Sequence, residues 1–173
     1  MSSGREQKAT PREASAGLRQ QAFDVTAHHV GARPTPGRNS AWGLIMETGY
    51  PTAVASLITF SDGTTSIYFS SGGGVIGAGG HSEVRDASKA LLTSVNTYLK
   101  EFTPATQHPL PSVGQVLFYA RTFEGLLSAQ AAENDLGEGR HTLSPLFHAG
   151  HRVIGHLRQI SEKELRDDSA RGS

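Results

Sequence analysis

The sequence predicts an α+β domain in which an antiparallel sheet of about five strands is covered by two helices, in the order β-β-β-α-β-β-α. Three observations lead to this fold class. Apolar runs bounded by turn residues predict the strands, and an apolar stripe with helical spacing predicts a helix over residues 82–102. A second stripe predicts a helix over residues 144–160. Each helix is amphipathic and needs a sheet face to cover, so the expected architecture has two layers.

The first three strands are expected at residues 42–46, 53–60 and 65–70. Between the second and the third lies Asp62-Gly63, a pair that favours a tight hairpin turn of type I′ because both positions can adopt positive φ angles. The three strands should therefore form an antiparallel meander.

The helix over residues 82–102 carries the clearest pattern in the chain. Ser82 is a suitable N-cap and Pro104 ends the helical pattern. The stripe recurs at spacings of three and four and consists of Val84, Ala87, Leu91, Val95, Tyr98 and Phe102. Leu91 and Val95 lie at its centre and are the expected core residues.

The second half of the chain should add two strands and the last helix. The strands are expected at residues 113–122 and 126–132, and an acidic loop at 133–139 follows them. Ser144-Pro145 places a cap residue and a first-turn proline in their preferred order at the start of the helix.

The chain divides into three parts by composition. Residues 1–40 are expected to form a flexible segment, in which Thr10, Pro11 and Glu13 permit one short capped helix. Residues 41–160 hold all the long periodic segments and form the expected domain. Residues 161–173 contain one large apolar side chain, Leu165, and are expected to be a disordered tail.

Composition disfavours several classes of function. The 173 residues carry 16 basic and 16 acidic side chains, a net charge of zero, which lacks the basic surplus of a nucleic-acid-binding protein. There is no cysteine, so disulfides, thiolate metal sites and cysteine nucleophiles are excluded. The short apolar runs and the polar N-terminus predict a cytoplasmic protein with no membrane partner. No cofactor is expected.

The most unusual segment is residues 72–80, which hold six glycines in nine positions between a strand and a helix. Three interpretations stay open: a structural bend, a contact with a partner, and an anion or nucleotide site. The third would use Gly74, Gly77, Gly79, Gly80, His81 and Ser82. The structural interpretation is favoured, because the helix starts too late for a dinucleotide motif and Glu83 and Asp86 would repel an anion.

Histidines gather near the last helix. His148 and His151 are three positions apart and so share a helix face, which makes them weak candidates for a metal site, but no metal is predicted because no further ligand stands at a suitable spacing. A solvated or interface face is the favoured interpretation. No arrangement of serine, histidine and acid predicts nucleophilic catalysis.

The order of elements over residues 41–160 resembles the profilin-like group of small domains, which includes roadblock and longin modules. That resemblance implies a scaffold that pairs through sheets or helices and carries over no functional residue. The sequence thus predicts a non-catalytic interaction module that binds a protein partner and forms homo-oligomers. The alternative is a protein, possibly an enzyme, that binds a small ligand or phosphate through residues 72–80.

Overall fold

The computed structural model describes residues 8–172. Within them the chain forms seven strands, four α-helices and two short 3₁₀ helices, labelled η. In chain order these elements are α1 (Pro11–Asp24), β1 (Ala41–Gly49), β2 (Val54–Phe60), β3 (Thr65–Phe69), β4 (Gly74–Val75), η1 (Ala78–Gly80), α2 (Ser82–Tyr98), η2 (Leu99–Glu101), β5 (Thr103–Pro104), β6 (Gln115–Thr122), β7 (Gly125–Ala132), α3 (Glu133–Gly137) and α4 (Ser144–Arg171).

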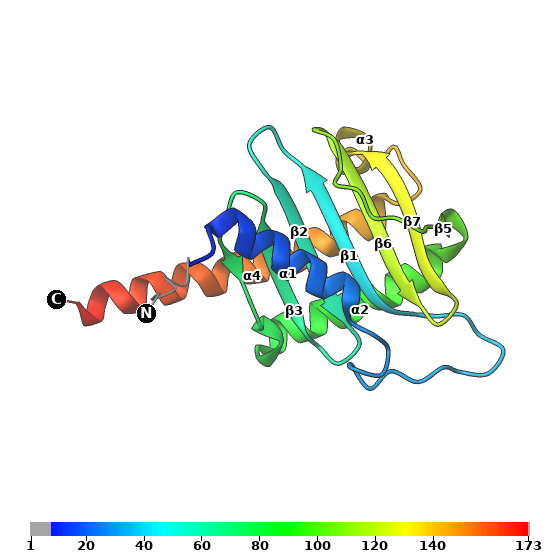
Figure 1. Cartoon of the computed structure of the whole chain (residues 1–173), viewed down its shortest axis with the longest axis horizontal. Helices are drawn as coiled ribbons and strands as arrows, with labels where there is room; N and C mark the ends of the chain where they lie inside the picture. The colour runs from blue at the N-terminus through cyan, green and yellow to red at the C-terminus, as the bar shows by residue number, and fades with distance from the viewer. Residues whose placement is uncertain (1–7, 173) are drawn as a thin grey trace, which may run out of the picture.

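The strands form one antiparallel sheet in the order β4-β3-β2-β1-β6-β7-β5. The longest strands, β1, β2, β6 and β7, occupy its middle, as Figure 1 shows. Strands β1 to β4 lie next to one another in chain order, β6 pairs with β7, and β5 pairs with the outer edge of β7. Strands β1 and β6 join the two halves of the sheet.

Helices α2 and α4 cover one face of the sheet side by side (Figure 1). Most of the stripe predicted over residues 82–102 is buried there, with Ala87 and Tyr98 partly buried, and Leu91 and Val95 are fully inaccessible to solvent. The same face of the sheet contributes Leu44, Met46 and Phe118 to this larger hydrophobic core. The burial of these apolar side chains is the main contribution to the free energy that holds α2 and α4 against the sheet.

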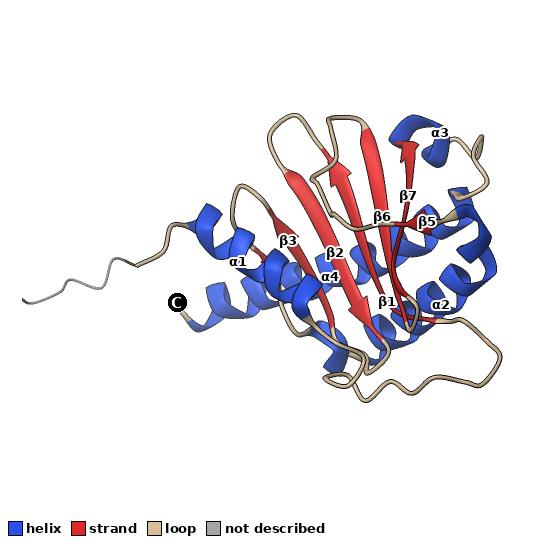
Figure 2. Ribbon diagram, turned by 45° about the vertical axis from the view of Figure 1, so that its right-hand side comes forward, coloured by secondary structure: helices blue, strands red, loops and turns tan. Residues whose placement is uncertain are grey.

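Helix α1 crosses the opposite face of the sheet, on the side away from α2 and α4 (Figure 2). It begins with the capping box anticipated from Thr10 and Glu13, in which each side chain bonds the backbone of the other residue. Its Phe23 ring is buried edge-on against Tyr119 of β6, with the ring centroids 5.2 Å apart. The guanidinium of Arg121 donates to the carbonyl oxygens of Phe23 and Val25, which caps the end of α1.

The α+β class and the antiparallel sheet are confirmed, but five strands and two helices undercount the elements of the described chain. Strands β4 and β5 have two residues each, too few to show an alternating pattern. The expected acidic loop begins with the short helix α3. Helix α1 adds a partial third layer, so the two-layer expectation was incomplete.

The hairpin between β2 and β3 is present, but its turn is not of type I′. Gly63 has φ of 92°, whereas Asp62 does not have a positive φ. The amide of Gly63 donates to the carbonyl of Phe60 and that of Phe60 to the carbonyl of Thr64, so the loop spans residues 61–64. The Asp62 carboxylate accepts from the Thr64 amide and hydroxyl, which stabilises this wider turn.

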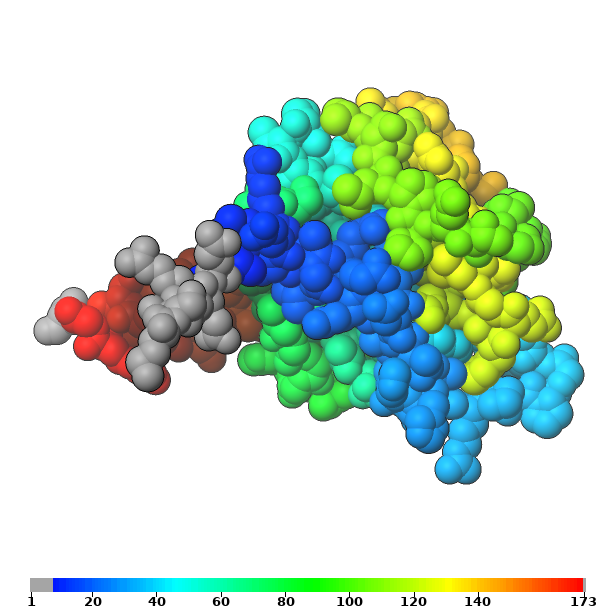
Figure 3. Space-filling view, viewed as in Figure 1, coloured from blue at the N-terminus to red at the C-terminus, as the bar shows by residue number. Residues whose placement is uncertain are grey.

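The last buried residue of α4 is Leu157, and its helical backbone continues to Arg171. Figure 3 shows this end of the chain extending beyond the body of the protein. Residues 162–171 are exposed. None of the helices within residues 8–172 combines the length and the apolar character that a membrane crossing requires.

Candidate functional site

The glycine segment, residues 72–80, follows β3 and packs against its edge. Gly74 pairs with Tyr68 and Val75 with Ile67. Its amide groups donate within the protein: Gly72 to the carbonyl of Phe69, and Gly77 to the hydroxyl of Ser66. These amides are therefore engaged in holding the segment against β3.

Two glycines of this segment allow close approach of backbone to backbone. A Cβ atom at Gly74 would lie 2.0 Å from the carbonyl oxygen of Ile67, and one at Gly79 would lie 2.0 Å from that of Gly63. No side chain fits at those distances. Gly77 needs to be glycine for a different reason, since its φ of 70° is left-handed although its surroundings are open.

Three of the six candidate ligand residues line one cavity. Gly74, Gly77 and His81 line a cavity of about 220 Å³ that is closed on the other side by Ile160, Ser161 and Glu164 of α4. The Ser82 hydroxyl donates to the Glu83 carboxylate at 3.1 Å. The pKa of Glu83 is lowered, first by its own backbone amide and then by this serine. Gly79 and Gly80 lie in the short helix η1.

A larger groove of about 470 Å³ continues from that cavity between the start of α2 and the second half of α4. Its lining mixes acidic, basic and imidazole side chains around a few apolar ones, and consists of His81, Glu83, Val84, His156, Gln159, Ile160, Lys163, Glu164 and Asp167. Ile76 and Leu165 are 63% and 66% exposed. This groove connects the glycine segment to the extending part of α4.

The two weak metal candidates have different environments. His148 is exposed, whereas the His151 ring packs against Phe147 with the ring centroids 4.3 Å apart. Burial lowers the pKa of His151, as do the neighbouring His148 and Arg158. Across residues 8–172, no group of three histidine, cysteine or acidic side chains is placed to hold a metal ion.

A buried polar cluster beneath α1 was not foreseen from the sequence. The side chain of Glu47 in β1 is fully buried and accepts two hydrogen bonds of 2.7 Å from the Arg19 guanidinium and one of 2.7 Å from the Ser56 hydroxyl. Arg19 also donates to the carbonyl of His108 at 2.7 Å. The one available signal was a charged residue, Glu47, inside an apolar strand, because such a charge requires a partner.

The connector over residues 105–112 runs over this cluster. The His108 ring stacks on Phe23 at 3.8 Å, and the Tyr119 hydroxyl donates to the carbonyl of Pro109 at 2.6 Å. Burial raises the pKa of Tyr119 to about 12, and the nearby Glu47 carboxylate adds to the shift. The cluster thus joins α1, the sheet and the connector.

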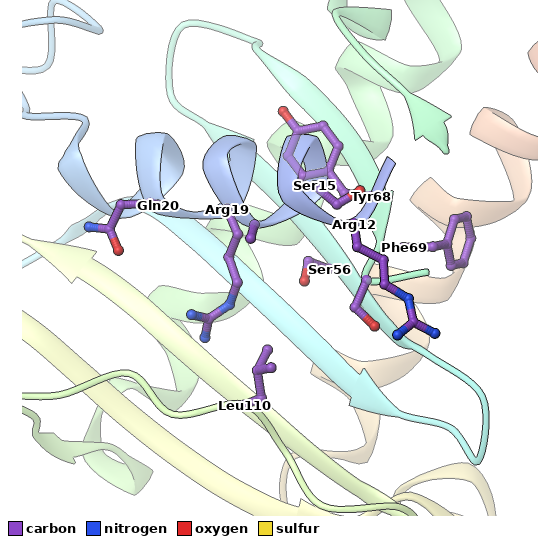
Figure 4. A pocket seen from close by; sticks show the side chains of 10 residues that line it. Arg12, Ser15, Arg19, Gln20, Ser56, Tyr68, Phe69 and Leu110 are labelled. Carbon is purple, nitrogen blue, oxygen red and sulfur yellow. The ribbon is translucent and has the colours of Figure 1, made fainter. Parts of the chain in front are cut away.

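A pocket of about 290 Å³ adjoins the cluster on its β3 side. Figure 4 shows the side chains of Arg12 and Arg19 extending from α1 toward the sheet, with Ser56 between them. Its lining consists of Arg12, Ser15, Ala16, Arg19, Gln20, Ser56, Tyr68, Phe69, Ser70 and Leu110.

The sequence matches no protein-family model and no curated protein, and the fold matches no solved structure. The function is therefore inferred from the surfaces and cavities of this chain.

Proposed function

We propose that the protein is a non-catalytic interaction module that self-associates through the end of α4. The surface concerned is named here the α4 extension, residues 158–171, together with Ile76 beside it. The observation that carries the proposal is that α4 continues for fourteen residues beyond Leu157, its last buried residue. Isolated helices of about this length are marginal in water. A partner that covers the α4 extension would supply the missing stabilisation.

Two exposed apolar side chains, one on the α4 extension and one beside it, favour a protein contact. Leu165 and Ile76 are the two most exposed isoleucine or leucine side chains of the described chain, at 66% and 63%. Ile76 lines the cavity that Ile160, Ser161 and Glu164 of α4 close, so this exposed isoleucine lies next to the α4 extension.

The charges favour a second copy of the same chain as the partner. The α4 extension carries four basic and four acidic side chains, which are Arg158, Glu162, Lys163, Glu164, Arg166, Asp167, Asp168 and Arg171. Two such helices side by side offer opposite charges to each other, as in the pairing of charged helices in coiled coils. The zero net charge of the whole chain also removes the repulsion that keeps like-charged copies apart.

The proposal is tested by the mass of the full-length protein in solution, measured by light scattering over a concentration series. We expect a dimer, and Leu165→Glu and Ile76→Glu should each shift it toward the monomer, because a carboxylate in an apolar contact is costly to desolvate. Val113→Glu is the matched control, since Val113 is equally exposed, at 63%, but is not part of this surface.

A wild-type protein that stays monomeric at about 100 µM, where standard interfaces are occupied, would contradict the proposal. The same conclusion would follow if Val113→Glu dissociated the dimer as strongly as Leu165→Glu. The resemblance to roadblock and longin modules that the expected element order suggested lends no support to pairing, because the observed order has additional strands and helices.

Binding of a small ligand by the glycine segment is the second candidate. It is favoured by the 220 Å³ cavity that Gly74, Gly77 and His81 share with α4. Glu164 also lines that cavity and would oppose an anion, so a neutral or cationic ligand fits better than a phosphate. Perturbation of the His81 ring signals in an NMR titration with adenosine, and not with inorganic phosphate, would support this second function.

A further inference from the structure

The pocket between α1 and the sheet carries a single net positive charge. Arg19 is neutralised by Glu47, to which it is bound through two 2.7 Å hydrogen bonds. Arg12 has an exposed side chain with neither a hydrogen bond nor an ion pair to any residue in the described part of the chain. The uncompensated guanidinium of Arg12 therefore selects for a ligand with one negative charge.

Two hydroxyl groups in the pocket are free to donate. Ser15 is only 6% exposed, and its hydroxyl forms no hydrogen bond with the residues that the structure describes. The Ser70 oxygen accepts from the amide of Val54 at 2.8 Å, which leaves its proton available. The fully buried side-chain polar atoms that lack a partner in the described chain are Asn39 Oδ1, Trp42 Nε1 and His151 Nε2, so the Ser15 oxygen keeps contact with solvent in the pocket. Its hydroxyl can therefore donate to a ligand there.

Apolar side chains complete the wall. Phe69 and Leu110 line the pocket and are 36% and 51% exposed, and Ala16 and Tyr68 lie beside them. Its volume of about 290 Å³ is at the lower end of small-molecule sites. The pocket combines one cation, two donors and an apolar wall, which suits a small molecule with an acidic head and an apolar body.

We propose that this pocket binds a small monocarboxylic acid, whose carboxylate pairs with Arg12 and accepts from Ser15 and Ser70, while its body contacts Phe69 and Leu110. A planar carboxylate matches the two parallel donors of a guanidinium. A phosphate would bring more negative charge than Arg12 balances, because the second arginine of the lining, Arg19, is already paired with Glu47. The site is separate from the α4 extension, on the opposite face of the sheet.

The test is an NMR titration of the full-length protein with acetate, hexanoate and benzoate. We expect saturable shifts of the Ser15, Ser56 and Ser70 amide signals with hexanoate or benzoate, and weaker ones with acetate, which lacks an apolar body. Benzamide has the shape of benzoate without its charge and should bind at least about tenfold more weakly, because a charged hydrogen bond is worth about 1.5 kcal/mol or more.

Two variants separate charge from shape. Arg12→Gln should raise the dissociation constant for benzoate at least about tenfold. Ala16→Phe places a ring at the mouth of the pocket and should abolish benzoate binding. Arg12 and Ala16 are both exposed, so neither variant should change the melting temperature. Arg152→Gln is the matched control, since Arg152 is an exposed arginine on α4.

The proposal is overturned if none of the three acids shifts the pocket signals, or if benzamide binds as tightly as benzoate. It is also overturned if inorganic phosphate binds more tightly than the carboxylic acids, or if Arg12→Gln binds benzoate like the wild type.

Discussion

Arg19 of α1 and Glu47 of β1 are 28 positions apart in the chain and form a two-point ion pair across the interior, with both nitrogen–oxygen distances at 2.7 Å. The Glu47 side chain is fully buried and that of Arg19 is 18% exposed. This pair ties the N-terminal helix to the central strand of the sheet, and it lies at the edge of the pocket proposed to bind a carboxylic acid.

Arg19→Met should destabilise the protein by about 3–5 kcal/mol, because it leaves the buried Glu47 carboxylate with Ser56 as its remaining partner. Replacing both residues, in Arg19→Met/Glu47→Met, should recover much of this loss, since no buried charge then remains. Urea unfolding measures both changes.

The control for that experiment is the exposed pair Arg140–Asp135, whose side chains are 54% and 48% exposed. Arg140→Met should cost less than about 1 kcal/mol. If Arg19→Met were as mild as Arg140→Met, α1 would not be held on the sheet by this ion pair in solution.

Alkaline titration should distinguish Tyr119 from the other tyrosines. Its pKa is raised to about 12 from an ordinary value of 10, through burial and the nearby Glu47 carboxylate. Above pH 10 the unfolded chain loses this proton while the folded chain keeps it, so stability declines as the pH rises from 10 toward 12. Ultraviolet difference spectra of the wild type and of Tyr119→Phe would measure the effect.

The variant should lack the last phenol to ionise and should show a smaller loss of stability over that pH range. A Tyr119 that ionises together with the other tyrosines would mean that the connector over residues 105–112 opens readily and exposes the hydroxyl.

Leu91→Ala should cost about 2–5 kcal/mol, because the side chain is fully buried at the centre of the α2 stripe. Leu110 is 51% exposed, and Leu110→Ala should change the free energy of unfolding by less than about 0.5 kcal/mol. Chemical denaturation compares the two. Equal effects would show that the α2 stripe does not face the sheet.

The sequence was sufficient to predict those helices and strands whose apolar residues recur over several helical turns or alternate along several strand residues. The stripe that contains Leu91 and Val95 predicted both the helix and its buried face, and the capping residues Thr10 and Glu13 indicated where α1 begins. The hairpin at Asp62-Gly63 was located correctly, although its turn type was wrong because a longer loop also accommodates one positive φ at Gly63.

The sequence could not reveal contacts that depend on distant parts of the chain. Strand β4 forms because Gly74 and Val75 pair with β3. A strand of two residues is too short to show an alternating pattern in the sequence, so it could not be predicted. The pairing of Arg19 with Glu47, and the pocket beside it, arise from the placement of α1 on the sheet, which no spacing along the chain encodes. Of the candidate residues chosen by proximity in sequence, Gly77 lines the cavity that faces α4, whereas the Ser82 hydroxyl donates to the neighbouring Glu83 carboxylate.

Adjacent glycines at the end of the glycine segment provide a matched test of its structural role. A Cβ at Gly79 would lie 2.0 Å from the carbonyl oxygen of Gly63 in the β2–β3 turn, whereas a Cβ at Gly80 would meet no heavy atom within 4 Å. Gly79→Ala must push two backbone segments apart and should cost about 1–3 kcal/mol or more. Gly80→Ala has space and no positive φ, so it should be neutral or stabilising by up to about 1 kcal/mol. The midpoints of urea unfolding measure the difference, and equal midpoints for the two variants would mean that the glycine segment does not rest against the β2–β3 turn in solution.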